Sequence, residues 1–363
     1  MKILILSSVG LDSGTGLRVS GIAEALAKLG HDVYLTGSNL TDKLPHVKYL
    51  AIKKHCGIRK YVFSTLSNIR FSKMVKADVI IASKAHPVSC LPAMLAKGKA
   101  KLILDFDDLE HAYWKNPLKI AFFMAAEKFF AKNFDYVTTH NENLKKYISR
   151  KLGLKESRII FLAQGIRTGM FTKRKTNLAE RLGLKNKKVI IYAAHLGVAA
   201  SDLDVVFEAL KGLSREDARL LVIGDGVKLS YYKRMAVEMG IKDRVVFAGH
   251  VKHDAMPEYM SIADAAVNFM RDSPANRCRA SIKIREYLAF GLPTICNIFG
   301  PDLENFRGFV YDFKAHDIKS FENGIVRALK NVYKKDEAKK QMQKWDWDVI
   351  AKGFEKGLER IAK

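Results

Sequence analysis

The sequence contains little cysteine, and its cysteines follow no disulfide or metal-binding pattern. Its 363 residues include four cysteines without CxxC spacing: Cys56, Cys90, Cys278 and Cys296. A small disulfide-stabilised scaffold and a thiolate zinc site are therefore excluded. We expect the cysteines to be small core residues of a cytoplasmic protein, in which thiols stay reduced.

Long apolar stretches are also lacking. No run approaches the roughly 20 apolar residues that a membrane-spanning helix needs. The opening "MKILIL" is apolar, but Ser and Gly follow at once, so we expect a buried first strand instead of a leader peptide. With 48% hydrophobic residues the chain can form a large core, and its length favours two domains over one.

Acidic residues are scarce relative to basic ones. The 62 Lys and Arg outnumber the 38 Asp and Glu, which gives a formal net charge of +24. The excess is greatest in residues 51–100, where ten basic residues accompany a single acid, Asp78. Such a charge fits nucleic acid, an anionic membrane surface or a phosphorylated substrate, and it also fits a lysine-rich surface without a specific partner.

Apolar segments alternate with amphipathic helical segments in two series, separated by the basic, turn-rich residues 163–187. Nearly continuous apolar strands between helices predict parallel sheets that are covered on both faces. We therefore predict an α/β protein with two Rossmann-like, doubly wound domains over residues 1–165 and 166–344. The two domains are expected to face a central cleft at the carboxyl ends of their strands, and a last helix is expected over 345–363.

A glycine-rich loop, "GLDSGTGLR" at residues 10–18, follows the first predicted strand and begins a helix. Glycines allow a ligand to approach the backbone, and a helix amino terminus favours an anion. The spacing is not GxGxxG, so a simple strand-to-helix turn explains the loop equally well.

Four acids follow a later buried strand in "LILDFDDLEH", residues 102–111. Acids at the end of a buried strand are unfavourable unless they are solvated, paired or functional. The DxD spacing fits a magnesium or manganese site, whereas Asp105 also fits a turn cap and the acids after it a helix start. We favour Asp107 or Asp108 as the residue that contacts a transferred sugar or an acceptor.

The stretch "SIKIREYLAFGLP", which begins at Ser281, predicts a helix with a polar first turn that ends at Gly291. Ser281 would cap the helix, and its first N–H groups with Lys283 would bind a diphosphate. Glu286, about one turn further on, would accept from both hydroxyls of a ribose. An exposed helix with a weak surface pair between Lys283 and Glu286 is the alternative.

Several segments of the sequence, taken in their order along the chain, resemble a known enzyme family. "SIKIREYLAFGLPTI", preceded by "LVIGDG" and "VVFAGHV", resembles the carboxyl-terminal half of retaining glycosyltransferases of family 4, which have the GT-B fold. "LAKLGHDVYLTG", "FDYVTTHNENLKKYI" and "IIFLAQGIRTGMF" are similar to their amino-terminal half. The final "WDWDVIAKGFEKGLERI" resembles the helix that crosses back onto the first domain, so the resemblance spans nearly the whole chain.

The resemblance implies transfer of a sugar, with retention of configuration, from a nucleoside diphosphate donor to an acceptor hydroxyl, without a metal or other cofactor. It implies a hexosyltransferase-type enzyme in which Asp107, Asp108 and Lys283 act in catalysis. Asp107 falls where many members have a histidine near the reacting sugar. The residues implied in donor binding are Gly14, Thr15, Gly16, His195, Gly249, Val251, Arg279, Ser281, Ile282 and Glu286.

Several positions depart from the family pattern. Cys278 replaces the first Glu of the E-x7-E motif, and Arg167 replaces a motif Asp. His195 and Ala200 stand where the family has an Arg and a Lys near the phosphates. One cation near the leaving diphosphate is what the chemistry requires, and Lys283, Arg277 or Arg279 would supply it.

The acceptor is expected to bind the first domain, where the basic excess lies. Residues 53–76 interleave cations with aromatic residues, a composition that suits an anionic membrane surface and a lipid-linked or cell-surface glycan precursor, or else an ordinary helix with a solvated basic face. Residues 118–134 are expected to form a core packing helix. The sequence does not specify the sugar, the base or the acceptor.

Two other classes of function remain open. A sugar-nucleotide epimerase on the same fold would release an altered donor without any acceptor. A basic membrane- or nucleic-acid-binding protein would lack transferase activity, although no recognised nucleic-acid-binding module is present and no specific nucleic acid is expected.

Overall fold

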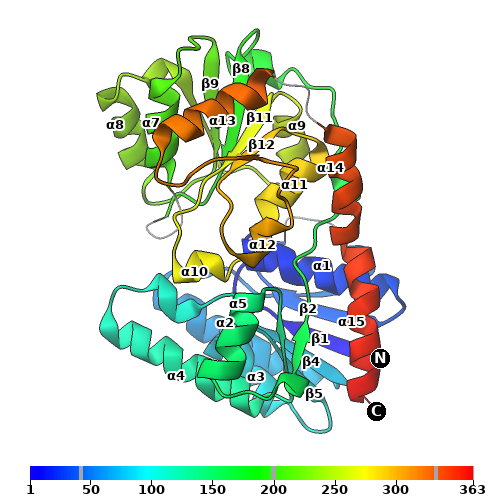
Figure 1. The fold of residues 1–363 in the computed structure, drawn as a ribbon. Helices are drawn as coiled ribbons and strands as arrows, with labels where there is room; N and C mark the ends of the chain where they lie inside the picture. The colour runs from blue at the N-terminus through cyan, green and yellow to red at the C-terminus, as the bar shows by residue number, and fades with distance from the viewer. Residues whose placement is uncertain (41–43, 198–201, 331–333, 363) are drawn as a thin grey trace. The chain divides into compact units, whose positions relative to one another are not determined.

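The computed structural model describes residues 1–40, 44–197, 202–330 and 334–362 (Figure 1). The chain forms two compact units. The first unit comprises Met1–Arg167, Cys278–Ala280 and Trp345–Lys363, and the second comprises Thr168–Arg277 and Ser281–Lys344. The first unit therefore includes both ends of the chain and a three-residue segment from within the second half.

The first unit is built on a seven-stranded parallel sheet of order β3-β2-β1-β4-β5-β6-β7. Apolar residues alternate between two cores on the faces of this sheet, since Leu4 and Leu6 lie in one core and Ile3 and Ile5 in the other. The strands are β1 Lys2–Leu6, β2 Asp32–Gly37, β3 Lys48–Ala51, β4 Val79–Ser83, β5 Lys101–Asp105, β6 Tyr136–Thr139 and β7 Ile159–Phe161.

Helices connect these strands and cover both faces of the sheet. The longer ones are α1 Gly14–Lys28, α2 Gly57–Met74, α3 Pro87–Leu95, α4 Pro117–Asn133 and α15 Trp347–Ala362, and the shorter ones are α5 Glu142–Lys146, the π-helical η2 Tyr147–Lys151, and the 3₁₀ turns η1 Glu110–Tyr113 and η3 Glu156–Arg158.

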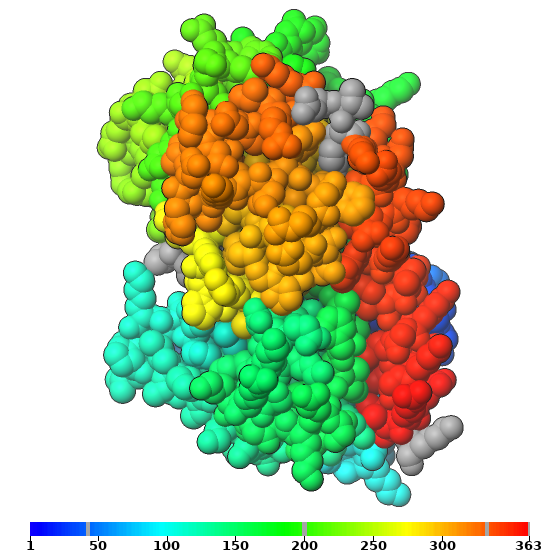
Figure 2. Space-filling model, viewed as in Figure 1, coloured from blue at the N-terminus to red at the C-terminus, as the bar shows by residue number. Residues whose placement is uncertain are grey.

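Helix α15, red in Figure 2, lies on the first unit although it ends the chain. Its Trp347 packs against the backbone at Gly21 of α1 and at Gly165. A Cβ atom at Gly165 would lie 2.5 Å from the indole, so both glycines are needed for the indole to fit.

The second unit contains a six-stranded parallel sheet of order β10-β9-β8-β11-β12-β13. Its strands are β8 Lys188–Ala193, β9 Ala218–Ile223, β10 Val245–Gly249, β11 Ala265–Asn268, β12 Thr294–Cys296 and β13 Tyr311–Asp312. Its helices are α6 Leu178–Arg181, α7 Leu203–Gly212, α8 Leu229–Glu238, α9 Met256–Met260, α10 Pro274–Arg277, α11 Ile282–Phe290, α12 Gly300–Glu304, α13 Ile318–Lys330 and α14 Lys335–Met342, with the 3₁₀ turns η4 Thr168–Met170, η5 Lys242–Arg244, η6 His253–Ala255 and η7 Gln343–Trp345 between or beside them, η7 ending in the first unit.

The two doubly wound parallel sheets confirm the predicted α/β class, and β1 confirms the buried first strand. Two expectations need correction. Cys56 is exposed, whereas the other three cysteines are buried as predicted. Helix α4 is not a core helix throughout, because Leu118, Phe122 and Phe129 are at least half exposed. Within the described residues, no helix is both long and apolar enough to cross a membrane.

Candidate functional site

In the first unit, the predicted site residues gather where the sheet order reverses. β1 leads to β2 on one side of the sheet and β4 leads to β5 on the other, although β1 and β4 are neighbours. Ligands of open parallel sheets bind at such a point, beyond the carboxyl ends of the strands. The segments that follow β1, β4 and β5 contribute Thr15, in the first turn of α1, Lys84 and Asp107 there.

Asp107 is a buried carboxylate held by two partners. Thr15 Oγ1 donates to Asp107 Oδ2 at 2.6 Å. His140 Nε2 donates to the Asp107 carbonyl at 2.7 Å and lies 3.5 Å from Oδ1. Burial disfavours the charge of Asp107, but the hydrogen bond with His140 and the charges of Arg18 and Lys84 outweigh it and lower the pKa of Asp107. Asp107 is therefore a fixed negative charge at neutral pH.

The glycine-rich loop brings Thr15 to this carboxylate. Ser13 caps α1, since its Oγ accepts from the Gly16 N–H at 3.1 Å. A Cβ at Gly16 would overlap the backbone of Gly10, so the loop closes only with glycine at this position. Gly14 is exposed at the first turn. Gly16 is thus explained by loop closure, whereas Gly14 is exposed and Thr15 contacts Asp107.

Arg18 is a buried residue beside the predicted site that sequence analysis missed. It is fully buried, and its Nε and Nη2 donate to both oxygens of Asp105 at 2.9 and 2.8 Å. Nη2 and Nη1 also donate to the carbonyls of Leu162 and Ala163 at 3.0 and 3.2 Å. Asp105 thus pairs with an arginine instead of capping a turn. A signal for this pair was present in the sequence, because Arg18 falls on the apolar face of a predicted helix. A buried arginine needs a buried carboxylate as its partner.

Asp108 belongs to a second charged cluster with a lysine that sequence analysis also missed. Lys84 Nζ lies 3.0 Å from Asp108 Oδ2 and 2.5 Å from Glu110 Oε1. Burial opposes the charge of Lys84, but the two carboxylates outweigh it and raise its pKa well above the usual value. Tyr113 donates to Asp108 Oδ1 at 2.8 Å. Asp108 is therefore neutralised by a neighbouring cation, unlike a carboxylate in a dedicated metal site.

The segment Cys278–Ala280 groups with the first unit, and the printed contacts of the Arg279 side chain are with residues of that unit. Arg279 Nε is 3.9 Å from Asp108 Oδ1, and its guanidinium lies 5.9 Å from the centre of the Tyr113 ring. Cys278 is buried, and burial together with the charge of Asp108 raises its pKa to about 11. A thiol that stays protonated at neutral pH does not replace the negative charge of the family's first motif glutamate.

In the second unit, α11 begins at the expected cap. Ser281 Oγ accepts from the Ile284 N–H at 3.4 Å, which confirms the predicted cap. Arg285, which is fully buried, donates to the Ser281 carbonyl at 2.9 Å and to Asp302 at 3.0 and 2.5 Å. Asp302 in turn accepts from the Ser281 N–H at 3.2 Å. The amino end of α11 is fixed by this buried ion pair.

Glu286 lies one turn into α11 and is only 4% exposed. His253 Nε2 lies 2.6 Å from Glu286 Oε1. The alternative of a surface pair between Glu286 and Lys283 is therefore wrong, because Glu286 is buried, while Lys283 and Ile282 are partly exposed in the first turn. His253 was missed, although it follows Gly249 and Val251 in the same segment.

The proposed base-binding segment follows β10. Gly249 has φ +71° and its carbonyl accepts from the Gly224 N–H at 2.8 Å. No atom lies within 4 Å of a Cβ built on Gly249, so this position needs glycine for its backbone conformation and not for space. Val251 is partly buried two residues further on.

The other positions considered as phosphate-binding cations, or as departures from the family pattern, have separate surroundings. His195 is exposed in the loop after β8, and Ala200 lies outside the described residues. Arg277 pairs with Asp272 at 2.6 and 2.7 Å, and Arg167 with Glu24 at 2.6 Å. Among the residues that the structure describes, no group of three or more His, Cys, Asp and Glu side chains is arranged to hold a metal ion.

Two family models match the chain, one in each half. The model of Glycosyltransferase Family 4 matches residues 13–169, and that of Glycosyl transferases group 1 matches residues 174–345. Two doubly wound parallel sheets with these loops define a glycosyltransferase of GT-B type. The chain belongs to the family 4 glycosyltransferases.

Solved structures share this fold over nearly the whole chain. Sucrose-phosphate synthase of Thermosynechococcus elongatus is 16% identical with a TM-score of 0.79 and 99% of each chain covered. Anabaena HepE in complex with UDP-glucose is 16% identical with a TM-score of 0.76, covering 99% of this chain and all of the other. An uncharacterized glycosyltransferase of Methanocaldococcus jannaschii is 24% identical over 230 residues, 60% of this chain. The chain spans 57% of the length of that relative.

Proposed function

We propose that the protein transfers a hexosyl group from a nucleoside diphosphate donor to an acceptor hydroxyl, with retention of anomeric configuration and without a metal ion. The observation that carries this proposal is the buried Glu286, paired with His253 one turn behind the capped amino terminus of α11. A carboxylate at this depth suits a ribose, and the helix terminus suits a diphosphate. The related fold of HepE holds UDP-glucose, which supports a donor of this class.

In the second unit, each donor group has a proposed partner. The first-turn N–H groups at Ser281 and Ile282 receive the diphosphate, with Lys283 as the adjacent cation. Glu286 binds the ribose hydroxyls, and the backbone at Gly249 and Val251 borders the base. His195 is the further donor contact, from the loop after β8. Lys283 thereby takes over the charge that the family's missing Arg and Lys supply.

In the first unit, we assign the cluster around Asp107 to the transferred sugar and the cluster around Asp108 to the acceptor. Departure of the diphosphate leaves an oxocarbenium-like centre, which a fixed carboxylate stabilises. Asp107 is such a carboxylate, and Gly14 and Thr15 beside it border the sugar. Asp108, with Lys84 and Arg279 beside it, is assigned to the acceptor hydroxyl. The acceptor class we propose is a lipid-linked or cell-surface glycan precursor.

A thermal-shift titration with UDP-, GDP- and ADP-sugars tests the donor site. We expect one nucleotide series to stabilise the wild-type protein, and Glu286→Ala to abolish the shift. Glu208→Ala, an exposed position on α7, is the matched control and retains the shift. Absence of a shift with every series would contradict the proposed donor class.

Product analysis tests the reaction itself. With the donor series that binds, we expect transfer to an acceptor hydroxyl that persists in excess EDTA, and the anomeric configuration of the product, read by NMR, to match the donor. Conversion of the donor to a different nucleotide sugar without any acceptor would instead identify an epimerase.

A further inference from the structure

Helix α2 buries polar side chains against its unit and exposes apolar ones to solvent. Only Asn68 and Ser72 are buried in α2 among its 18 residues. Asn68 donates to the carbonyls of Ser7 and Val88 at 3.1 and 2.9 Å and accepts from Thr36 at 2.7 Å. Most of its large apolar side chains are exposed instead, with exposed fractions of 80% for Ile58, 47% for Tyr61, 52% for Val62, 43% for Phe63 and 56% for Leu66, whereas Ile69 and Phe71 are partly buried.

Helix α4 repeats this arrangement on one side. Its buried side holds Phe123 and Phe130, so this helix does pack on the core. Its other side exposes an apolar stripe at helical spacing, in which Leu118 is 81%, Phe122 54% and Phe129 50% exposed. A helix of a soluble domain normally turns such residues inward, so the two helices leave apolar surface without a partner in the described chain.

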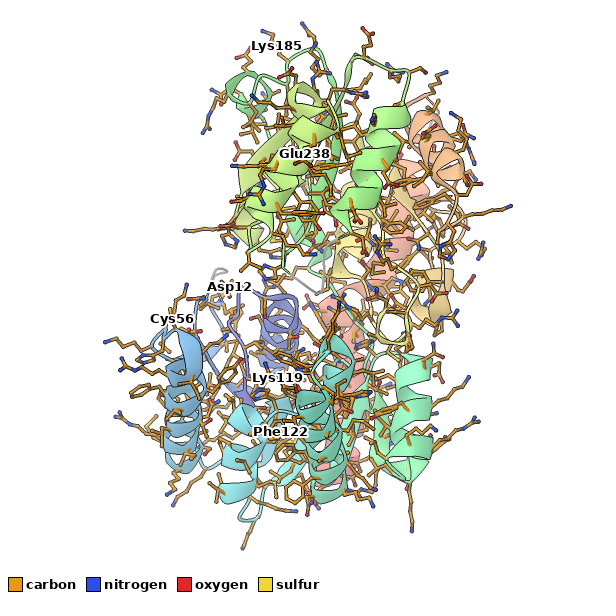
Figure 3. All side chains as sticks on the ribbon, turned by 90° about the vertical axis from the view of Figure 1, so that its left-hand side faces the viewer. Asp12, Cys56, Lys119, Phe122, Lys185 and Glu238 are labelled. Atoms are coloured by element: carbon orange, nitrogen blue, oxygen red, sulfur yellow. The ribbon has the colours of Figure 1, made fainter. Side chains whose placement is uncertain are left out.

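Stacked rings join α2, α3 and α4 into one surface. His86, the cap of α3, lies 5.6 Å from the Tyr61 ring of α2 and 6.0 Å from the Phe123 ring of α4. Trp114 stacks on Phe123 at 5.6 Å, and Lys119 lies over Trp114 at 4.1 Å. Figure 3 looks onto these three helices, with Cys56 at the start of α2 and Lys119 and Phe122 on α4. We call this surface the α2–α4 face.

The charges on the α2–α4 face have one sign. Helix α2 contains no acidic residue, and the single acid of α4, Glu127, is fully buried, where it accepts from His111 and Tyr147 at 2.9 and 2.7 Å. The exposed cations of the two helices are Arg59, Lys60, Arg70, Lys73, Lys119, Lys128 and Lys132. The face therefore combines protruding apolar side chains with uncompensated positive charge.

We propose that the α2–α4 face docks on the anionic headgroup surface of a lipid bilayer. Cations attract such a surface, and aliphatic and aromatic side chains enter the boundary between headgroups and acyl chains. Nucleic acid meets the cations but offers no apolar phase for Ile58, Leu66 and Leu118. The inference rests on the proposed function in one respect: docking brings the unit that carries Asp107 and Asp108 to the surface where a lipid-linked acceptor lies.

Co-sedimentation with large unilamellar vesicles tests the docking. We expect binding to phosphatidylcholine vesicles with about one-third phosphatidylglycerol at roughly physiological salt, and much weaker binding to phosphatidylcholine alone. Leu118→Ser with Phe122→Ser, and separately Lys119→Glu with Lys128→Glu, should each weaken binding at least tenfold. Val237→Ser and Lys185→Glu, both exposed in the second unit, are the matched controls and should bind as the wild type.

Donor binding serves as the independent readout. The variants of the α2–α4 face should keep the donor-induced thermal shift, and Glu286→Ala should keep vesicle binding, so the failure of one proposal is distinguishable from failure of the other. Absence of binding to anionic vesicles overturns the docking proposal, as does binding that the variants leave unchanged. Binding to random DNA that depends on the same side chains, with no binding to vesicles, overturns it in favour of nucleic acid.

Discussion

Arg18 and Asp105 form a buried, two-pronged ion pair at the carboxyl end of β5 in the first unit. Both side chains are fully buried, and two nitrogens of Arg18 donate to the two oxygens of Asp105. Thr15 precedes Arg18 by three residues on the same face of α1, and Asp107 follows Asp105 by two. The Arg18–Asp105 pair thus holds α1 against the end of β5, where Thr15 meets Asp107 at 2.6 Å.

Asp105→Asn should destabilise the first unit severely. The substitution removes the charged partner of the buried Arg18 and replaces one of the two carboxylate oxygens that accept from it by an NH2 group. Breaking a buried pair typically costs about 3–5 kcal/mol in the free energy of unfolding. Urea unfolding measures this loss. Asp312→Asn, which removes a partner of Arg307 from an exposed pair, is the control and should cost less than about 1 kcal/mol. Equal losses in the two variants would contradict the structural role of Arg18.

Gly21→Ala should destabilise the docking of α15 through Trp347. A Cβ at Gly21 would overlap the indole, so either the ring or the helix must shift, and such overpacking costs about 1–3 kcal/mol. The matched control is Gly353→Ala within α15, where a Cβ would meet no atom within 4 Å and helix propensity favours alanine by about 0.5–1 kcal/mol. Thermal melting compares them, and a more stable Gly21→Ala protein would contradict this packing.

The predictable parts of the structure were those that local patterns encode. Helix α11 begins after Ser281 and ends at Gly291 as predicted, because a capping serine and a glycine mark its ends, and α4 lies within one residue of the predicted 118–134 at each end. The apolar strands likewise follow from composition alone.

What could not be predicted depends on partners distant in sequence. Neither the Glu286–His253 contact nor the Lys84–Asp108 contact follows from spacing, because each joins separate loops. The apolar pattern of α4 predicts burial, and only the tertiary structure shows that Leu118, Phe122 and Phe129 are exposed. The inclusion of Cys278–Ala280 in the first unit has no local signal at all.

His86 should make stability fall as the pH is lowered. Burial, with the charges of Lys84 and Lys60, lowers its pKa from 6.5 to about 4. Between these values the unfolded chain binds a proton that the folded protein does not, so stability is fully present above about pH 6.5 and decreases toward pH 4. The expected decrease is up to about 3 kcal/mol, measured by urea unfolding at several pH values.

His86→Asn isolates this effect. Asparagine keeps a side-chain acceptor for the Val88 N–H, which the histidine ring accepts at 3.2 Å, but it does not titrate. The difference in unfolding free energy between wild type and variant should therefore change between pH 6.5 and pH 4. A difference that is constant across this range would show that His86 does not remain neutral in the folded protein.

Asp107→Asn should abolish most of the proposed transfer while leaving donor binding intact. The low pKa of Asp107 means that it carries a fixed charge across the neutral range, so its role is to stabilise a positive centre and not to exchange protons. Loss of one such group typically lowers kcat by about 100- to 1000-fold. The donor-induced thermal shift should persist, because Glu286 and the α11 terminus belong to the second unit.

Thr15→Val, which removes only the hydroxyl that donates to Asp107, should give a smaller loss of kcat with the fold unchanged. If Asp107→Asn instead raised KM for the donor and left kcat unchanged, Asp107 would be a binding residue and the assignment of the charged centre to the first unit would be wrong.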